Sequence, residues 1–448
     1  MSCSNNLSHI TDSEVKGVLN SLSFDYGKKL IEDIKDEVNG YVDYINKTKP
    51  LNFNEIYIEA NNEKFKINNK EPIKQLNSKI IDLHNDFIDK KTTIKNHVQH
   101  TINSLKELNN DKTASLINDN YASAEAIATN LDNDIINHKN DMLYGIPYAL
   151  KDLIATDNIK TTCGSKLFEN FIPDYNASVY QSLLDSNSIL TGKSNMDEFA
   201  MGGTGLYSSY GDVCNCLDNE RIVGGSSSGS ANLVASGILP FSIGTDTSDS
   251  VRQPASYTGT VGYIGTHGIA PTYGVLPYDS DDDDIGVFSN YVADAAIVAQ
   301  NISKTEKCNT DFFNNLNYAE NGNFAVIKNI DKSLYNDAKN AYTECLDKIK
   351  NFGNINYINI SDDLLNSLGE IASCCDHNAA YHSFSNLKYF IYGNDTNYND
   401  PNKNEYLKKE NINKLAPQVK RRIAAGACLE LKKYKKLILE KIENYREE

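Results

Sequence analysis

The stretch Val223-Gly-Gly-Ser-Ser-Ser-Gly-Ser230 runs without a break into the apolar segment Ala231-Asn-Leu-Val-Ala-Ser-Gly237. Runs rich in glycine and serine are usually flexible linkers. This run instead lies inside apolar sequence and leads directly into a helical pattern. We therefore predict a tight backbone that presents hydroxyl groups at the N-terminus of a helix, with a flexible linker as the alternative.

The sequence around this stretch, from residue 143 to about residue 305, alternates short apolar runs with helical patterns. Such alternation predicts an α/β fold in which helices cover a sheet. Strands are expected at 188–192, 237–244 and 261–264, and helices at 177–185 and 230–236.

Helical patterns dominate the N-terminal part of the chain. Residues 12–22 and 27–47 carry two of them, and the second has an apolar face that needs a partner surface. The Asn-rich segment Asn68-Asn-Lys-Glu-Pro72 then has the composition of a linker. We expect a helical N-terminal extension over 1–75 and one larger domain over 76–448.

The rest of that larger domain, outside 143–305, is also predicted mainly as helix. Residues 76–142 are polar and helical, as expected for helices that pack on the outside of a domain. Beyond residue 305, a strand is expected at 324–327 and a final helix at about 416–445.

Composition excludes several classes of protein. The formal net charge is −16, so the chain as a whole should repel nucleic-acid phosphates. No apolar run reaches the roughly 18 residues of a membrane span, and residues 1–22 resemble no targeting signal, which together predict a cytoplasmic protein. No metal is expected: the cysteines lack zinc-site spacing, and the acidic run 281–284 favours a solvated loop over a Ca²⁺ or Mg²⁺ site.

Two further segments carry potential chemistry. The first, Tyr144-Gly-Ile-Pro-Tyr-Ala-Leu-Lys151-Asp152, is an apolar run that ends in a lysine. Taken alone, this run predicts a strand that ends in a surface Lys–Asp pair. The second, Gly244-Thr-Asp-Thr-Ser-Asp-Ser250, takes an apolar strand into a polar turn. Such a turn is a usual place for a nucleophile in an α/β enzyme, although an ordinary polar loop has the same pattern.

Together, these three segments resemble the amidase signature family, over about residues 80–305 and more loosely to about 430. The resemblance implies a central mixed β-sheet covered by helices on both faces. It places the catalytic lysine at Lys151, the relay serine at Ser226 and the acylated serine at Ser250. Main-chain N–H groups of the turn at Thr247, Ser248 and Asp249 would then form the oxyanion hole.

These roles are chemically reasonable in their own right. A serine hydroxyl needs a base before it can attack an amide, and none of these segments contains a histidine. A lysine can be that base if burial keeps it neutral. A second serine can both accept and donate a proton, so it can connect the nucleophile to the lysine.

Within the family, Gly192-Lys-Ser-Asn-Met-Asp-Glu-Phe-Ala-Met-Gly202 resembles the A subunits of tRNA-dependent amidotransferases. The resemblance implies that the chain hydrolyses glutamine and passes ammonia to a B subunit. That partner would use ATP and Mg²⁺ to amidate Glu-tRNA(Gln) or Asp-tRNA(Asn), and it would bind most of the tRNA. The resemblance also implies that Gly202, Gly203 and Lys388 contact the substrate, and that this chain needs no cofactor of its own.

Residues 1–75 resemble the small C subunit of such complexes, with a lineage-specific helical extension as the alternative. Other positions depart from the family pattern: Ser228, Ser248 and Asp249 stand where glycine is usual, and the region of Lys388 is abbreviated. These departures leave two rival functions open, a stand-alone amidase for a small amide and a degenerate scaffold subunit.

Overall fold

The computed structural model describes residues 8–22, 24, 26–47, 77–110, 113–303, 312, 322–328, 330, 334–358, 378–388, 390–391 and 410–431. The predicted linker up to Pro72 and the predicted helical residues 432–445 lie outside the described residues. The expected domain boundary at residue 75 lies outside them as well, and it stays a prediction.

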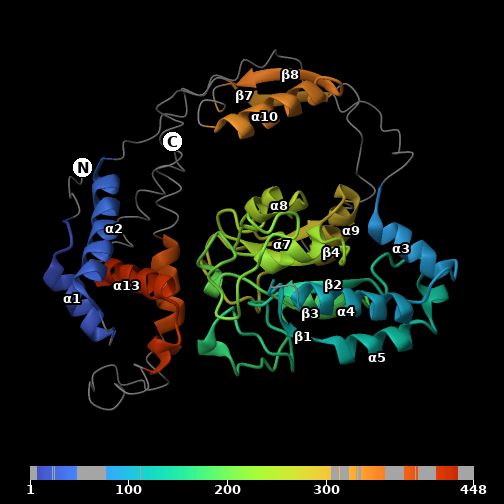
Figure 1. Cartoon of the computed structure of the whole chain (residues 1–448), viewed down its shortest axis with the longest axis horizontal. Coiled ribbons are helices and arrows are strands. Elements are labelled where there is room, and N and C mark those ends of the chain that lie inside the picture. Colours follow the sequence, from blue (N-terminus) through green and yellow to red (C-terminus); the bar gives the residue numbers. More distant parts are fainter. Residues whose placement is uncertain are drawn as a thin grey trace.

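The largest, helix-covered part of the molecule is built on a six-stranded mixed sheet (Figure 1). In sheet order its strands are β1 (Leu116–Asp119), β3 (Ile189–Ser194), β2 (Pro147–Lys151), β4 (Phe241–Asp246), β6 (Asp284–Ser289) and β5 (Val261–Ile264). The three central strands β3, β2 and β4 run parallel, whereas β1, β6 and β5 each pair antiparallel with a neighbour. The parallel strands end at the same edge, and β2 and β4 carry Lys151 and the turn before Ser250 to that edge.

Helices cover both faces of this sheet. They are α3 (Lys79–Ile88), α4 (Ile94–Asn110), α5 (Tyr121–Leu131), α6 (Ser178–Asp185), α7 (Ser228–Ala235), α8 (Arg252–Thr258) and α9 (Val292–Ile302). Phe288 of β6 packs in one cluster with residues of α7 and α8, whereas its neighbour Val287 belongs to the main core with Ile297 of α9. Successive residues of a strand point to opposite faces, so α7 and α9 lie on opposite sides of β6. The predicted α/β class, with a mixed sheet between helices, is confirmed.

Two details of the strands differ from the prediction. β4 begins at Phe241 rather than at 237, because Gly237 takes a left-handed conformation (φ +76°) and donates its N–H to Val234 O at the end of α7. β1 was not predicted at all. It has only four residues, too few for an alternating pattern, and it lies within the region 76–142 that was expected to be helical.

The two N-terminal helices pack against the C-terminal one. α1 (Asp12–Ser21) begins with a capping box in which the side chains of Thr11 and Glu14 bond each other's main-chain N–H groups. α2 (Lys28–Lys47) and α1 both contact α13 (Pro417–Leu431), and Arg421 Nε of α13 lies 3.1 Å from Glu37 Oε2 of α2 (Figure 1). The apolar face predicted for residues 27–47 therefore has a partner.

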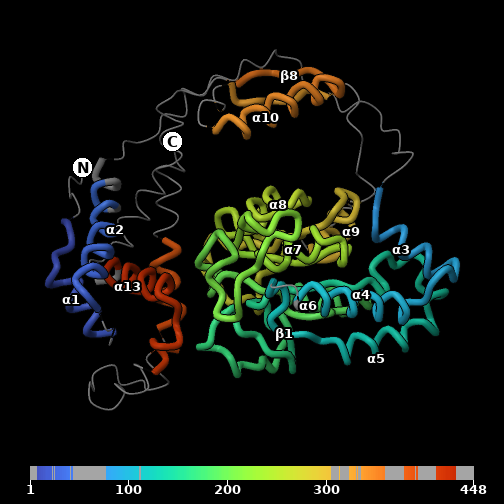
Figure 2. Tube along the Cα trace, viewed as in Figure 1, coloured from blue at the N-terminus to red at the C-terminus, as the bar shows by residue number. Residues whose placement is uncertain are grey.

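A small βαβ unit stands apart from the six-stranded sheet (Figure 2). It consists of β7 (Gly322–Ile327), α10 (Asn336–Ile349) and β8 (Gly353–Ile358), with the two strands parallel. The strand predicted at 324–327 is therefore confirmed. Among the described helices, none is long and apolar enough to cross a membrane.

Candidate active site

Lys151 ends β2 in the middle of the sheet, and its side chain is fully buried. Its Nζ lies 2.7 Å from Ser226 Oγ, 2.8 Å from Thr245 Oγ1 and 3.2 Å from the Thr245 carbonyl oxygen. Burial lowers the pKa of Lys151 to about 7, although carboxylates farther away act in the opposite direction. The alternative of a surface Lys–Asp pair is wrong, since Asp152 is buried as well.

The three contacts of Lys151 suit a neutral amine. Such an amine has two N–H groups and one lone pair. The Thr245 carbonyl oxygen can only accept, and Thr245 Oγ1 can accept the second N–H, so the lone pair is left for the hydroxyl proton of Ser226. The geometry therefore gives a neutral Lys151 the position of a base toward Ser226.

Ser226 lies on a tight loop rather than on a linker. The Gly225–Ser226 peptide bond is cis, and α7 begins two residues later. The Ser226 carbonyl oxygen accepts the N–H of Asp197 at 3.2 Å, and Gly225 N–H donates to Gln253 Oε1 at 3.0 Å. At Gly224 (φ +86°), a Cβ would lie only 2.8 Å from Pro254 Cα, which explains why this position needs glycine.

Ser250 lies against this loop, just before α8. Its main-chain carbonyl oxygen accepts the N–H of Ser227 at 3.3 Å, and its side chain is almost fully buried. The Ser250 hydroxyl has no hydrogen-bond partner among the described residues. The structure thus brings the three predicted catalytic residues, from three separate segments, to one place.

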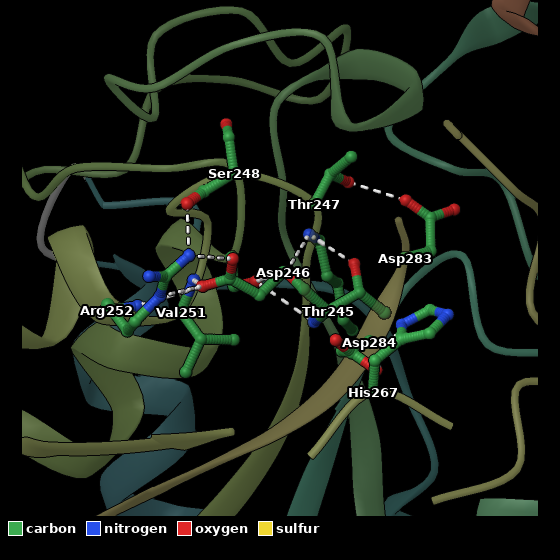
Figure 3. Close-up of polar contacts among 11 residues, drawn as sticks. Thr245, Asp246, Thr247, Ser248, Val251, Arg252, His267, Asp283 and Asp284 are labelled. Atoms are coloured by element: carbon green, nitrogen blue, oxygen red, sulfur yellow. Dashed lines mark hydrogen bonds and ion pairs between the residues drawn. The ribbon is translucent and has the colours of Figure 1, made fainter. Parts of the chain in front are cut away.

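The turn between β4 and α8 is held at both ends (Figure 3). At one end the Thr247 hydroxyl donates to Asp283 Oδ1 at 2.6 Å. At the other end, the carboxylate of Asp246 accepts the N–H groups of Val251 at 2.8 Å and Arg252 at 3.2 Å. The guanidinium of Arg252 also pairs with Asp246 and donates to the Ser248 carbonyl oxygen.

The predicted oxyanion residues occupy this turn. Ser248 and Asp249 are exposed. Within the part of the chain that the structure describes, the N–H groups of Thr247, Ser248 and Ser250 donate to no other residue. They are therefore available as donors to an oxyanion.

Asp246 and Asp197 are residues that sequence reasoning missed. A carboxylate at the end of a strand, six residues before an arginine that begins a helix, was the available signal for Asp246. Asp197 is buried and accepts N–H groups of Thr204, Gly205 and Tyr207 at 3.0–3.2 Å, which anchors the loop after Met201. Its main-chain N–H also holds Ser226, so it couples this loop to the serine loop.

The predicted substrate residues lie on two different elements. Gly202 leaves room for the carboxylate of Asp197, because a Cβ there would lie 2.6 Å from Asp197 Cγ. A Cβ at Gly203 would lie 3.4 Å from Nε2 of Gln253, the residue whose Oε1 accepts the N–H of Gly225. Lys388 lies among the helical residues 378–388, and its contact with a substrate stays a prediction.

Comparison with known proteins identifies relatives of this chain. The amidase family profile matches residues 97–448. The chain is 34% identical over 356 residues to the A subunit of the glutamyl-tRNA(Gln) amidotransferase of Mycoplasma genitalium, covering 76% of this chain and 73% of the relative. It is 47% identical over 171 residues to the protein of the same name in Mycoplasma pneumoniae, covering 38% of this chain and 36% of the relative.

Solved structures support the fold. One described as "Crystal structure of amidase" has a TM-score of 0.69 at 24% identity and covers 82% of this chain and 77% of its own. The A subunit of the Thermotoga maritima glutamyl-tRNA(Gln) amidotransferase has a TM-score of 0.54 at 23% identity, covering 80% of this chain and 76% of its own. With the family profile spanning most of the sequence and the site geometry in place, the chain belongs to the amidase family.

Proposed function

We propose that this chain is the glutamine-hydrolysing subunit of a tRNA-dependent amidotransferase. The observation that carries the proposal is the buried Lys151 amine, 2.7 Å from Ser226 Oγ, on a loop that contacts Ser250. The relatives from the two Mycoplasma species, matched over 73% and 36% of their own length, are both named as the A subunit of a glutamyl-tRNA(Gln) amidotransferase.

In the proposed mechanism, Ser250 Oγ attacks the carboxamide carbon of glutamine. Its proton passes to Ser226 Oγ, and the proton of Ser226 passes to the lone pair of Lys151. The oxyanion that forms accepts hydrogen bonds from the turn at 247–250, each worth about 3–4 kcal/mol when well aligned. We expect the Ser250 side chain to turn toward Ser226 when the substrate binds, because catalytic hydrogen bonds often tighten only in the complex.

The remaining steps return the protons. Lys151 gives its extra proton back through Ser226 to the leaving nitrogen, so the carbon–nitrogen bond breaks and ammonia departs. A glutamyl ester on Ser250 remains. Water attacks this ester with the same relay acting as base, which releases glutamate and restores the Ser250 hydroxyl.

The proposal includes the partners. Ammonia would pass to a B subunit that uses ATP and Mg²⁺ to amidate the misacylated tRNA, and this partner would hold most of the tRNA. A net charge of −16 suits a chain that leaves the nucleic acid to its partner. Residues 1–75 would take the role of the C subunit, and the complex would work in the cytoplasm. The glutamine-hydrolysing chain itself would need no cofactor.

The test is glutamine hydrolysis by the purified chain, alone and together with charged tRNA and the B subunit. We expect ammonia release that the partner and tRNA stimulate, and a covalent adduct on Ser250 after treatment with a glutamine-analogue electrophile, read by mass spectrometry. If the chain alone hydrolysed varied small amides as fast as it does with the B subunit and tRNA, a stand-alone amidase would be favoured. No adduct and no hydrolysis in the complete complex would favour a degenerate scaffold.

The pH dependence gives an independent check. Lys151 acts only as the neutral amine, so acylation of Ser250 should rise with pH through the lysine's pKa of about 7 and be about tenfold slower at pH 6 than at its plateau. The measurement is the rate of Ser250 modification by a sulfonyl fluoride across this range. Asp283 could also titrate in this pH range, because burial raises its pKa to about 6. The variant Asp283→Asn is therefore the control. If the rate no longer fell at low pH in this variant, the pH dependence would belong to Asp283, and its assignment to Lys151 would be wrong.

A further inference from the structure

The loop 277–283 and the helical residues 378–388 meet in a polar contact outside the candidate active site. Asn378 Nδ2 donates to Asp279 Oδ2 at 3.0 Å, and Asn386 Nδ2 donates to the Pro277 carbonyl oxygen at 3.2 Å. Between these two contacts lies His382, which is buried. Nothing in the proposed glutaminase reaction uses this histidine.

Two carboxylates lie close to the imidazole ring of His382. Its Nδ1 lies 3.1 Å from Asp279 Oδ1 and 3.2 Å from Ser280 Oγ, and its Nε2 lies 3.6 Å from Asp281 Oδ2. Asp279 is fully buried, whereas the side chain of Asp281 is 57% exposed. The run 281–284 was expected to be a solvated loop, but Asp283 is buried as well, so only part of it faces water.

One ring nitrogen of His382 lacks a hydrogen-bond partner. Nε2 is buried and makes no hydrogen bond, although the side chain is only 7% exposed. A buried polar atom without a hydrogen bond is costly, and in a native protein it needs an explanation. Here the atom faces the carboxylate of Asp281 at a distance longer than a hydrogen bond.

We infer that Asp279, Asp281 and His382 form a binding site for a divalent transition-metal ion, best represented by Zn²⁺. One ligand atom from each residue lies within 4.8 Å of the other two, and within the described residues no other His, Cys, Asp or Glu group of three does so. Zinc binds nitrogen and oxygen ligands at about 2.0–2.2 Å, so two ligands of a tetrahedral site lie about 3.3–3.6 Å apart, and the farthest of these atoms would move closer by up to about 1.5 Å when the ion binds.

The choice of metal follows from the ligands. Ca²⁺ and Mg²⁺ prefer oxygen ligands alone, whereas a neutral imidazole with two carboxylates suits zinc and its neighbours. Three protein ligands leave a position for water, which reaches the site from the exposed side of Asp281.

The ion would also act on the candidate active site. Asp283 accepts the N–H groups of Tyr278 and Asp279 and the hydroxyl of Thr247, so the same loop anchors the turn before Ser250. An ion that joins this loop to residues 378–388 would make that anchor more rigid. The inference does not depend on the glutaminase proposal, because metal binding is measured without turnover.

The test is a titration of the full chain, first freed of metal with a chelator, with ZnCl₂ in a calorimeter. We expect one Zn²⁺ per chain, bound at least tenfold more weakly by Asp281→Asn and by His382→Gln. His267→Ala is the matched control, since His267 faces a single carboxylate, that of Asp284 at 3.1 Å, and is exposed. Its affinity should equal that of the unmodified protein.

Two safeguards keep the outcome clear. Asp281 is exposed, so Asp281→Asn should fold even if His382→Gln does not. The chain has free cysteines, such as Cys163 and Cys428, and a titration with Co²⁺ would reveal thiolate ligands by their charge-transfer absorption. The inference would be overturned by an absence of stoichiometric binding, or by an affinity in both ligand variants equal to that of the unmodified protein. Thiolate absorption, or displacement of Zn²⁺ by equimolar Mg²⁺, would overturn it as well.

Discussion

Ser250→Ala is expected to lower glutamine hydrolysis by about 10⁶-fold, to the level of a site that only binds the substrate. The variant removes the only atom that forms the ester, and no neighbouring group can replace it. Because Ser250 is small and its hydroxyl has no hydrogen bond among the described residues, the fold should remain intact. The measurement is ammonia release by the complete complex, with thermal unfolding as a check on folding.

The matched control for this variant is Ser248→Ala. Ser248 lies two residues before Ser250 on the same turn, but its side chain is exposed and the proposed reaction uses only its main-chain N–H. Its hydrolysis rate should stay within a few-fold of that of the unmodified complex. If Ser250→Ala kept the activity, the nucleophile assignment would be wrong, and tRNA amidation that continued with glutamine as donor would place the glutaminase elsewhere.

Lys151→Met is expected to slow acylation of Ser250 by about 10²–10⁴-fold, which is the usual contribution of a positioned base. Methionine fills a similar volume, but it offers no lone pair to the hydroxyl of Ser226. The rate should also lose its rise with pH through about 7, because the group that titrates there is gone. The measurement is the sulfonyl fluoride rate against pH.

Lys193→Met is the control for burial. Lys193 is also a fully buried lysine, on the neighbouring strand β3, and burial lowers its pKa to about 8. Its Nζ, however, donates to the Ile154 carbonyl oxygen and to two threonine hydroxyls, and to no serine. Lys193→Met should lower thermal stability and keep the pH dependence of acylation. Equal loss of acylation in both variants would mean that Lys151 acts through packing and not as a base.

Much of the fold was accessible from local sequence patterns. β5 lies at its predicted residues, and α6 and β3 are displaced by one or two residues. β1 was missed because its four residues are too short for any period to appear, and β4 was displaced because a glycine turn after α7 is as apolar as a strand. Boundaries of this kind depend on which residue closes a hydrogen bond, and the hydrophobic pattern does not contain that information.

The candidate site, too, could be predicted only in part from the sequence. The resemblance of three segments led to Lys151, Ser226 and Ser250 because each segment has its own composition and spacing. The supports of the site were harder to find. Asp197 and Asp246 act through main-chain N–H groups, and almost any residue can supply such a group, so the sequence does not mark the partner.

The sequence alone determined that the chain has an α/β core, a serine-rich loop before a helix, and a polar turn that carries a serine after a strand. These features arise from neighbouring residues, so local patterns specify them. Only the tertiary structure decided that Lys151 is fully buried, that Arg252 clamps the turn through Asp246, and that His382 meets Asp279. Burial and the pairing of distant charges depend on which segments pack together, and the packing of distant segments is a property of the whole chain.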